Sequence, residues 1–525
     1  MPNTSPINVL LVGGGGREHA LARGIARSPR LRKLWVTHPR NPGLADLGHA
    51  IDVQVSTRDI YRLESFCDRE KIDLVVIGPE DPLADGWADR LATPDRLVFG
   101  PTRAGAQIEA DKSWAKQLMR AGSIPTAEAR SFTDPLASIA YIESRFADDP
   151  AVASILDKIK HIARPEDRRA TLEAALRLGK VLARREVPPS SDLTLLTARI
   201  FPDGPATPVK LETVSKTARA YYDAWVKPRR DLPVLKAAGL AKGKGVILPS
   251  SLAEAADAVR RVMVEKAFGD AGKTLVIEER LTGPEVSVLA LVDGRTIMLL
   301  PVCQDHKRLG DGDTGPNTGG MGAYCPADII DAGTLAVIER EILVPTVDSL
   351  RREGIEYRGV LYAGLMLTHA GPKVLEFNCR FGDPECQPLM ARFRGDLITL
   401  LEATALGRLD RVDCSWDPRA ACCVVLASEG YPDEPRTGQV ITGLDEAESL
   451  GGVVVDHAGT ARDASGRIVT AGGRVLGVTA LGDDLPAARA RAYEAVERIR
   501  FPGMQYRRDI AAGAVAPKTV AQPGA

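Results

Sequence analysis

Four consecutive glycines follow a short apolar segment near the start of the chain, and this feature restricts the fold more than any other. Asn8–Val12 (N-V-L-L-V) reads as a buried strand, Gly13–Gly16 follows at once, and a helical pattern continues from Arg17 through Ala26. Strand, glycine loop and helix in succession are typical of α/β sheets, where the loop and the helix N-terminus present backbone N–H groups to a phosphate. The same succession also suits a tight turn without a ligand. The glycines predict an α/β domain and leave the phosphate site open.

The alternation of strands and helices continues to about residue 105. A helical stripe at Asp59–Glu70 precedes apolar strands at Asp73–Ile77 and Leu97–Phe99. The polar loop Gly78–Pro82 follows the first of these strands directly, which is where open α/β sheets place ligands. The glycines do not follow G-x-G-x-x-G, and no acidic residue clearly closes the strand Leu34–Thr37, so a nicotinamide cofactor is disfavoured. Residues 1–105 are predicted to form an N-terminal α/β domain.

Bulk composition excludes several classes of protein. The chain has 525 residues, which suggests more than one domain, and a net charge of -1, which gives no electrostatic case for binding nucleic acid or an anionic membrane. Its eight cysteines form no C-x-x-C pair, so neither a zinc knuckle nor a disulfide framework is expected. No apolar segment approaches the length of a membrane span, and no secretory signal is recognised. A reducing, cytoplasmic setting is expected.

Two helical regions follow the first domain. Residues Ala106–Gly122 are predicted to form one helix, with Lys112 and Lys116 on the same face. Residues 146–228 are charged and helix-rich, and they contain no glycine loop, metal-ligand spacing or acid-base pair. A segment of this length is too long for a structureless connection. We expect an inserted helical subdomain without chemistry of its own.

A second glycine-rich loop follows the predicted strand Val234–Lys236. Ala237–Gly245 reads A-A-G-L-A-K-G-K-G, so that Lys242 and Lys244 lie among glycines after the strand residue Lys236. This composition suits a phosphate cradle, although the loop is not a Walker A motif. A flexible basic turn is the alternative.

The densest polar segment of the chain is Gln304–Tyr324 (Q-D-H-K-R-L-G-D-G-D-T-G-P-N-T-G-G-M-G-A-Y). It follows strands predicted at Thr274–Ile277 and Val286–Val292, the second of which ends in the hairpin turn Asp293-Gly294. Because so polar and glycine-rich a segment cannot bury itself, it is predicted to be a loop. Donors and acceptors mixed with Met and Tyr favour a functional loop over a solvated linker.

An alternating stretch, Val374–Glu385 (V-L-E-F-N-C-R-F-G-D-P-E), carries the most specific chemistry. Alternation of period two predicts a strand, so Glu376 and Asn378 point to the same face. A carboxylate and an amide oxygen side by side suit Mg²⁺, which keeps phosphate oxygens among its other ligands. Arg380 continues the parity and adds a fork for phosphate or carboxylate. An ordinary solvated strand end is the alternative.

The C-terminal part, from about Ala420, is predicted to be rich in strands. Candidate strands are Cys422–Ala427, Gly452–Val455 and Arg474–Ala480, followed by a helix at Pro486–Arg498. It shows no acid-base pair. The tail, residues 513–525, is rich in Ala, Pro and Gly and is predicted to be disordered.

These landmarks together resemble the phosphoribosylamine–glycine ligases (glycinamide ribonucleotide synthetases) of the ATP-grasp superfamily. The motifs that carry the resemblance are G-G-G-G-R-E-H-A at 13–20, G-P-E-D-P-L at 78–83, F-G-P-T at 99–102, L-A-K-G-K-G-V at 240–246, the polar segment at 304–324, L-Y-A-G-L-M at 361–366, L-E-F-N-C-R-F-G-D-P-E at 375–385, G-Y-P at 430–432, R-T-G at 436–438 and H-A-G-T at 457–460. Apart from the insert, they cover nearly the whole chain.

The resemblance implies a multidomain fold of α/β and α+β type. A doubly wound N-terminal α/β domain (1–105), thought to bind substrate, would be followed by an ATP-grasp domain pair (106–420) interrupted by the helical insert 146–228, and by a C-terminal β-rich domain (421–512). It further implies that ATP drives the ligation of glycine to 5-phosphoribosylamine through glycyl phosphate, in the second step of de novo purine synthesis. ATP and Mg²⁺, or Mn²⁺, are the implied cofactors. A cytoplasmic monomer without nucleic-acid or membrane partners is expected.

The resemblance also implies site residues, carried over motif by motif. Glu376 and Asn378 would hold the metal, and Arg380, Asp305 and Lys307 would act in catalysis. The residues implied to bind ATP are Lys112, Lys236, Lys242, Gly243, Lys244, Gly245, Glu278, Glu279 and Glu285. The residues implied to bind the other substrates are Gly13, Gly14, Gly15, Gly16, Arg17, Pro79, Glu80, Asn317, Thr318, Gly319, Gly320, Asp383 and Pro384.

Two departures from the family pattern leave alternatives open. The usual K-A-D-G-L-A is K-A-A-G-L-A here, so Ala238 replaces an aspartate, and weakened support for the lid is expected. The insert stands where the family has a short turn. A sibling ATP-grasp ligase for another acid and amine is the alternative among enzymes. A non-catalytic interaction protein that works through the insert is the alternative outside them.

Overall fold

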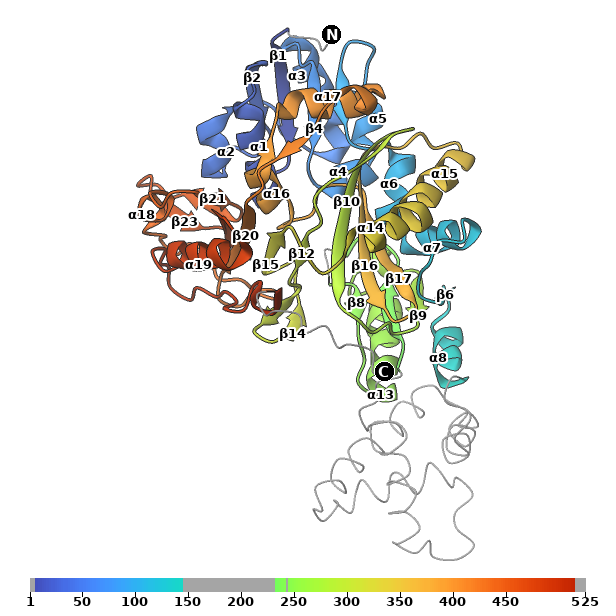
Figure 1. The fold of residues 1–525 in the computed structure, drawn as a ribbon. Coiled ribbons are helices and arrows are strands. Elements are labelled where there is room, and N and C mark those ends of the chain that lie inside the picture. The colour runs from blue at the N-terminus through green and yellow to red at the C-terminus, as the bar shows by residue number, and fades with distance from the viewer. Residues whose placement is uncertain (1–4, 145–231, 242–243, 515–525) are drawn as a thin grey trace, which may run out of the picture. The chain divides into compact units, whose positions relative to one another are not determined.

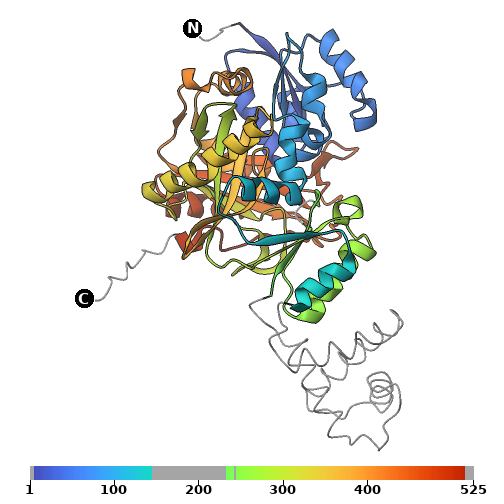
Figure 2. The same cartoon turned by 90° about the vertical axis from the view of Figure 1, so that its right-hand side faces the viewer.

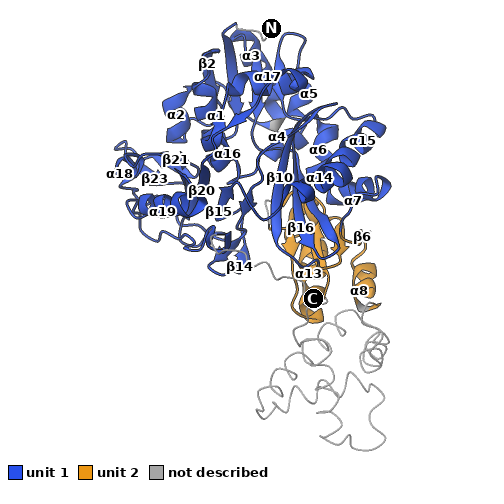
Figure 3. Ribbon diagram, viewed as in Figure 1, with its two compact units in different colours: residues 1–126, 281–525 blue, residues 127–280 orange. Residues whose placement is uncertain are grey.

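A computed structural model of the protein describes residues 5–144, 232–241 and 244–514. The predicted insert 146–228, Lys242, Gly243 and the tail from residue 515 lie outside the described residues. The chain divides into two compact units, Met1–Thr126 with Leu281–Ala525, and Ala127–Arg280, which Figure 3 colours separately.

The N-terminal part of unit 1 is a five-stranded parallel sheet, as predicted, and is drawn in blue in Figure 1. Its strands are β1 (Ile7–Val12), β2 (Leu31–Val36), β3 (His49–Ala50), β4 (Leu74–Ile77) and β5 (Leu97–Phe99), in the order β3-β2-β1-β4-β5. All six residues of β1 are buried. The order reverses between β1 and β4, and in open α/β sheets ligands bind at the carboxyl ends of the strands at such a reversal. The first glycine loop and the Gly78–Pro82 loop both start at that point.

One predicted helix is in fact two. The structure has α6 (Arg103–Ala110) and α7 (Lys112–Ala121), where a single helix over Ala106–Gly122 was predicted, and that prediction was wrong. Asp111 separates them, because its side chain accepts the backbone N–H groups of Ser113 and Trp114 and so caps α7.

A four-stranded antiparallel sheet forms the next layer of unit 1. It consists of β10 (Glu285–Asp293), β11 (Ile297–Leu299), β16 (Arg358–Thr368) and β17 (Gly371–Asn378), in the order β11-β10-β16-β17. The strand predicted at Val286–Val292, the turn at Asp293-Gly294 and a strand through Glu376 and Asn378 are confirmed. β17 ends at Asn378, so Arg380 lies just beyond the strand.

The polar segment Gln304–Tyr324 is not the plain loop that was predicted. It forms β12 (Gln304–Asp305), a small hairpin of β13 (Arg308–Gly310) and β14 (Thr314–Asn317), and β15 (Gly322–Cys325). β12 and β15 extend the C-terminal sheet of β20 (Ala420–Ala427), β24 (Arg474–Gly482) and β21 (Val453–His457), in the order β12-β15-β20-β24-β21. This polar segment can form strands because the backbone N–H and C=O groups of β12 and β15 are hydrogen-bonded to neighbouring strands of the sheet.

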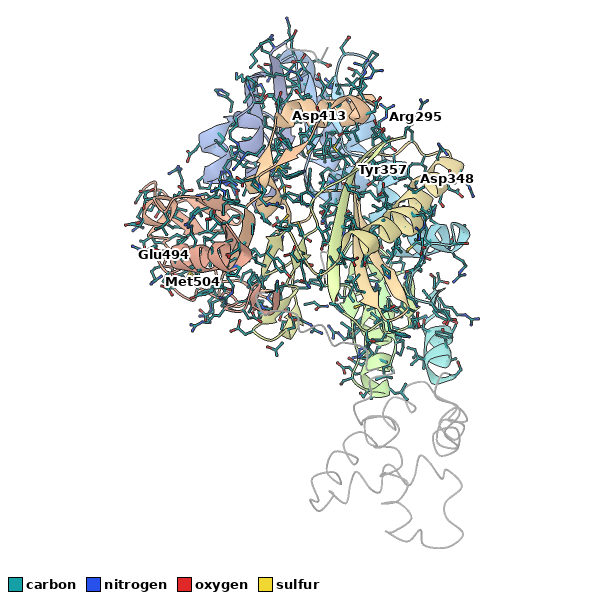
Figure 4. The ribbon with its side chains drawn as sticks, in the orientation of Figure 1. Arg295, Asp348, Tyr357, Asp413, Glu494 and Met504 are labelled. Atoms are coloured by element: carbon teal, nitrogen blue, oxygen red, sulfur yellow. The ribbon has the colours of Figure 1, made fainter. Side chains whose placement is uncertain are left out.

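Helices cover these sheets, and several bring distant segments together. α7 packs beside α15 (Val344–Arg352), and both stand out in Figures 1 and 2. Tyr357, labelled in Figure 4, is 1% exposed and donates its hydroxyl to the carbonyl of Val360 at 2.6 Å. The remaining elements of unit 1 are α1 (Gly16–Ala26), α2 (Pro42–Leu47), η1 (Thr57–Asp59), α3 (Ile60–Arg69), α4 (Glu80–Ala84), α5 (Trp87–Leu91), α14 (Ala332–Ile338), η5 (Glu339–Leu343), α16 (Cys386–Arg392), β18 (Phe393–Arg394), α17 (Leu397–Leu406), η6 (Leu409–Arg411), β19 (Ser415–Trp416), α18 (Leu444–Glu448), β22 (Thr460–Arg462), β23 (Ile468–Thr470), α19 (Leu485–Val496) and η7 (Ala512–Ala514).

Unit 2 is a four-stranded antiparallel sheet with helices. Its strands are β6 (Ala129–Phe132), β7 (Val234–Ala237), β8 (Val246–Ile247) and β9 (Leu275–Glu278), in the order β6-β9-β7-β8. Its other elements are α8 (Pro135–Ser144), α13 (Leu252–Val259), η3 (Arg260–Val264) and η4 (Gly269–Gly272). Ser251 caps α13 by accepting the backbone N–H of Glu254. α13 continues directly into η3, so the helical segment of unit 2 runs from Leu252 to Val264.

No helix in the described part of the chain combines the length and apolar character needed to cross a membrane.

Candidate active site

The end of β17 places a carboxylate and an amide on one face. Glu376 pairs with Gly364 of β16, and Asn378 pairs with Tyr362. The residue opposite Glu376 is a glycine, and a Cβ at that position would come within 3.4 Å of Cγ of Glu376. The side chain of Glu376 is 31% exposed, and Asn378 is 8% exposed. Two oxygen donors thus share a partly open face, a composition that fits a hard divalent cation.

Lys307 lies between two carboxylates of this region. Its Nζ is 3.4 Å from Oε2 of Glu285 and 3.7 Å from Oε1 of Glu376. Burial alone would lower the pKa of Lys307, but the carboxylates of Asp305, Glu285 and Glu376 outweigh it and raise the pKa well above its usual range. The ammonium is therefore a fixed positive charge at the site.

Asp305 stands at the edge of a buried hydrogen-bonded cluster. Ser287 Oγ lies 3.4 Å from Asp305 Oδ1, 2.8 Å from Tyr362 Oη and 3.3 Å from Glu385 Oε1. Burial raises the pKa of Asp305 to about 7, the nearby carboxylates add to the effect, and Lys307 opposes it. A carboxyl group with that pKa exchanges a proton near neutral pH.

Arg380 is held on three sides. Its Nε donates to Glu80 Oε2 at 3.1 Å, one terminal nitrogen donates to Glu109 Oε1 at 2.8 Å and to Asn378 Oδ1 at 3.3 Å, and the other donates to the carbonyl of Phe381 at 3.3 Å. Burial would lower the pKa of Arg380, but Glu109 and Glu80 raise it well above its usual range. The guanidinium is a charge whose position is set by the protein.

The same carboxylate of Glu80 joins Arg380 to the first glycine loop. Arg17 lies 3.9 Å from Glu80 and donates to Glu18 at 2.6 Å, and Glu18 accepts the backbone N–H of Gly15 at 2.6 Å. Burial opposes ionisation of Glu80, but Arg380 and Arg17 outweigh it and lower its pKa to about 2. The loop after β1 and the loop after β4 therefore meet at the reversal of the strand order.

Asp383 and Pro384 lie against both glycine-containing loops of unit 1. Asp383 accepts the backbone N–H of Arg17 at 3.4 Å and the amide of Gln387 at 2.9 Å. A Cβ on Gly320 would lie 2.6 Å from Cδ of Pro384. Arg474 donates to the carbonyls of Gly319 at 2.8 Å and Asp383 at 2.6 Å. Asn317, Thr318, Gly319 and Gly320 are therefore brought toward the 383–384 turn.

The predicted ATP-binding residues of unit 2 form a separate group. Lys236 and Glu278 make a buried ion pair of 3.1 Å. Glu279 Oε1 accepts the backbone N–H of Glu128 at 3.2 Å, and Lys244 is exposed beside the buried Gly245. Ala238 packs with Ala129 and Val276 in a small apolar cluster, so the position where the family has an aspartate is apolar here.

Two lysines of α7 have different surroundings. Lys112 is the first residue of the helix and is half-buried. Lys116 is buried and donates to the hydroxyl of Thr126 at 2.7 Å, and Thr126 donates to the carbonyl of Val374 in β17.

Sequence reasoning missed several residues of the site. They are Glu18, Glu109, Ser287, Tyr362, Glu385, Gln387 and Arg474. Arg474 begins an otherwise apolar strand, and that contrast was an available signal. Glu109 stands in no motif, and its partner Arg380 is 271 residues away.

No group of three or more His, Cys, Asp or Glu side chains gathers as a metal centre in the regions that the structure describes. The pair Glu376 and Asn378 fits the cation in a different way, because Mg²⁺ takes few protein ligands and fills its shell with phosphate and water oxygens.

Comparisons with known proteins give one consistent family. Three family models match, described as the N domain (residues 7–109), the ATP-grasp (A) domain (206–386) and the C domain (421–513) of phosphoribosylglycinamide synthetase. The match to the ATP-grasp domain begins at residue 206, inside the segment 146–228 that was predicted to be an insert.

Relatives span nearly the whole chain. A phosphoribosylamine–glycine ligase of Rhodopirellula baltica is 42% identical over 508 residues, which cover 96% of this chain and 97% of that protein. The Pseudomonas aeruginosa ligase of the same name is 39% identical and covers 97% of this chain and 99% of its own. The chicken trifunctional purine biosynthetic protein adenosine-3 is 42% identical over 97% of this chain and 42% of its own length.

Solved structures show the same fold. The phosphoribosylamine–glycine ligase of Thermotoga maritima superposes with a TM-score of 0.67 at 28% identity, covering 96% of this chain and all of that one. A biotin carboxylase of Campylobacter jejuni superposes with a TM-score of 0.59 at 13% identity, over 96% of this chain and 93% of its own, which shows likeness of fold alone. The predicted multidomain α/β architecture is confirmed by these matches.

Proposed function

The chain belongs to the phosphoribosylglycinamide synthetase family, and on that premise we propose a role for each part of the site. The protein is a phosphoribosylamine–glycine ligase of the ATP-grasp type. It joins glycine to 5-phosphoribosylamine at the expense of ATP, giving N1-(5-phosphoribosyl)glycinamide, ADP and phosphate in the second step of de novo purine biosynthesis.

The chemistry requires an activated carboxylate, because a free carboxylate is a poor electrophile toward an amine. Transfer of the γ-phosphoryl group of ATP to glycine gives glycyl phosphate. The amine of 5-phosphoribosylamine then attacks the acyl carbon, and phosphate leaves. Catalysis is mainly placement of the reactants and cancellation of charge, so no Ser or Cys nucleophile is needed.

Glu376 and Asn378 are the proposed ligands of Mg²⁺ or Mn²⁺. The cation would neutralise charge on the transferring phosphoryl group. Lys307, paired with Glu376 and Glu285, and Arg380, held between Glu80 and Glu109, add fixed positive charge on the same side of β17.

The residues expected to bind ATP are proposed for each unit by itself. In unit 2, Lys236 and Lys242–Gly245 would bind phosphates, and Glu278 and Glu279 would bind adenine or ribose. In unit 1, Lys112 would contact phosphates and Glu285 would contact the nucleoside. The buried Lys236–Glu278 pair supports the assignment, because it holds a cation at a fixed place beside the second glycine loop.

The amine and glycine are proposed to bind where the loops of unit 1 meet. Gly13–Arg17, Pro79-Glu80, Asn317–Gly320 and Asp383-Pro384 would line this end, and Asp305 would face the amine. The reversal of the strand order between β1 and β4 supports the placement, because Gly78 donates its N–H to the carbonyl of Val12 and so joins the two loops.

We propose a cytoplasmic monomer with the domain limits expected from the sequence, including the insert 146–228. The eight cysteines are free, which suits a reducing compartment. Deleting residues 146–205 should preserve ligase activity if the insert only adds structure. A shorter deletion is chosen because the family match starts at residue 206.

The observation that carries the proposal is the shared face of Glu376 and Asn378 with Lys307 in ion-pair distance. The test is a ligase assay with glycine, 5-phosphoribosylamine, ATP and Mg²⁺, with the product identified by mass. Replacing Glu376 by Ala should abolish turnover while thermal unfolding stays near that of the parent. If another amino acid or amine supports turnover and glycine does not, the assignment of substrates is wrong.

A further inference from the structure

A buried carboxylate outside every recognised motif holds the end of β17. Glu109, in α6, is 7% exposed. Its Oε2 accepts the backbone N–H of Cys379 at 2.7 Å, and its Oε1 accepts from a terminal nitrogen of Arg380 at 2.8 Å. One side chain therefore fixes both the main chain at residue 379 and the side chain at residue 380.

These two contacts bracket the proposed metal ligand. Cys379 is the residue after Asn378, so the direction of the Asn378 side chain depends on the main chain that Glu109 holds. The same guanidinium nitrogen that donates to Glu109 also lies 3.3 Å from Asn378 Oδ1. Moving Glu109 would displace an amide oxygen and a guanidinium together.

The other partners of Arg380 cannot replace this contact. Glu80 holds only Nε of Arg380, its side chain is 22% exposed, and it is shared with Arg17. Burial and the neighbouring Glu80 raise the pKa of Glu109, while Arg380 opposes the rise. The Glu109 carboxyl is buried despite the cost of removing it from water, and its two hydrogen-bond donors come from the two residues that directly follow β17.

We propose that Glu109 is a positioning residue of the ligase reaction. It sets the orientation of Asn378 and Arg380, and through them the binding of the divalent cation with nucleotide, without touching the substrates. The proposal rests on the proposed assignment of Glu376 and Asn378 as metal ligands.

The test compares Glu109→Gln, Glu109→Asp and Glu109→Ala with a matched control. Glutamine offers one acceptor oxygen where two are used, so one of the two contacts is lost at nearly constant volume. The control is Glu402→Gln, because Glu402 is partly buried and uses both carboxylate oxygens to pair with Arg30, at 2.7 and 3.3 Å, away from β17. Each variant is assayed for kcat and KM, for thermal unfolding, and for binding of Mn²⁺ in the presence of ADP by electron paramagnetic resonance.

We expect kcat of Glu109→Gln to fall by about 10- to 100-fold, because small displacements of a catalytic group have effects of this size. Affinity for Mn²⁺ with ADP should fall by about 10-fold, the lower end for loss of a residue that orients a metal ligand. The KM for glycine should change little in Glu109→Gln. Glu109→Asp should recover part of the loss in kcat and part of the loss in Mn²⁺ affinity. For Glu402→Gln, both kcat and Mn²⁺ affinity should stay within about two-fold of the parent, because its ion pair lies outside the site.

Two results would overturn the proposal. One is a Glu109→Gln protein whose Mn²⁺ affinity matches that of the parent. The other is a loss in Glu402→Gln as large as that in Glu109→Gln, because the effect would then reflect general stability. If the parent itself binds Mn²⁺ with ADP but Glu376→Ala binds it equally well, the proposed metal ligands are wrong, and that outcome is distinct from failure at Glu109. If Glu109→Ala does not fold, the Mn²⁺ affinity and kcat of Glu109→Gln and Glu109→Asp still test the proposal.

Discussion

The protonation state of single residues at this site is set by the groups around them. Asp305 is the clearest case, because burial raises its pKa to about 7 against the opposing charge of Lys307. If the anion is the form that faces the amine, kcat/KM should fall as the pH drops below about 7. The Asp305→Asn protein should lose this limb of the profile together with most of its activity. The measurement is kcat/KM for 5-phosphoribosylamine across pH for both proteins.

The outcome that contradicts this assignment is a residual Asp305→Asn activity that titrates with the same midpoint as the parent. The limb would then belong to another group or to the substrate. Glu285→Gln is a useful comparison with Asp305→Asn, because Glu285 also pairs with Lys307. Unlike Asp305, its side chain makes no hydrogen bond to Ser287 in the part of the chain that the structure describes.

Gly13 tests how tightly the first loop is packed. Its φ is +117°, and a Cβ would lie 2.6 Å from Cγ of Glu18 and 2.8 Å from Cδ of Pro79. We expect Gly13→Ala to cost about 1–2 kcal/mol for its backbone alone, and more for the contacts. Activity should fall further, because Glu18 and the loop shift together.

The control for Gly13 is Gly438→Ala. Gly438 has φ of +84°, and an added Cβ meets nothing within 4 Å. Thermal unfolding should show a smaller loss for Gly438→Ala, with kcat unchanged. Equal losses of stability and activity in the two variants would mean that packing against Glu18 and Pro79 is unimportant.

Among the elements, the hairpin β13–β14 depends on a residue from the end of the chain. Arg507 is 1% exposed and donates to Asp313 at 2.6 Å, to Asp509 at 2.7 Å and to the carbonyl of Arg308 at 3.3 Å. We expect Arg507→Met to lower the free energy of unfolding by about 2–4 kcal/mol, because several charge-assisted hydrogen bonds are lost. The KM for 5-phosphoribosylamine should rise, since β14 ends at Asn317, the first residue of the Asn317–Gly320 segment.

Denaturant unfolding and steady-state kinetics check the Arg507 prediction. Arg498→Met is the control, because Arg498 forms an exposed pair with Glu494 at 3.5 Å and its loss should cost less than about 0.5 kcal/mol. A large loss of stability in Arg507→Met with an unchanged KM would show that the hairpin does not position the substrate loop.

Elements were predictable from the sequence where one local signal dominates. The apolar run of β1 and the alternation in β17 gave correct strands, because burial of one or both faces sets the pattern. The break at Asp111 was missed, since an aspartate inside a helical stripe looks like a surface residue until its side chain caps α7. β12 and β15 were missed because their partner β20 lies far along the chain.

Over the whole molecule, the sequence led to a hypothesis about which residues serve the site, but it gave no sign of the contacts that hold those residues in place. The motifs pointed to Glu376, Asn378 and Arg380, whose chemistry is local. Glu109 and Arg474 were missed, because each acts through a contact with a distant segment that no spacing reveals. Residues that position others are chosen by the tertiary fold, and a single sequence gives little sign of them.

The contact between the first helix and the last sheet gives a prediction for the stability of the whole protein. Asp456, in β21, is fully buried and is paired with Arg23 of α1, 433 residues away, at 2.8 Å. Burial raises its pKa to about 7 despite the opposing effect of Arg23, and Asp383 and Glu448 add to the rise. Between about pH 4 and about pH 7, Asp456 therefore keeps its proton in the folded state, whereas the same carboxyl has lost its proton in the unfolded state.

It follows that Asp456 contributes stability that declines as the pH rises from about 4 to about 7. His19, 3.5 Å from Asp456, has its pKa lowered by burial and by Arg23, and contributes with the opposite slope below about pH 6.5, so the parent's own profile is a sum of both. The informative quantity is the Tm of Asp456→Asn minus the Tm of the parent, which should rise with pH across this window. Asp463→Asn, whose carboxyl has a lowered pKa, should give a flat difference from about pH 5 to about pH 7. A difference for Asp456→Asn that falls with pH would mean that the ion pair with Arg23 outweighs burial.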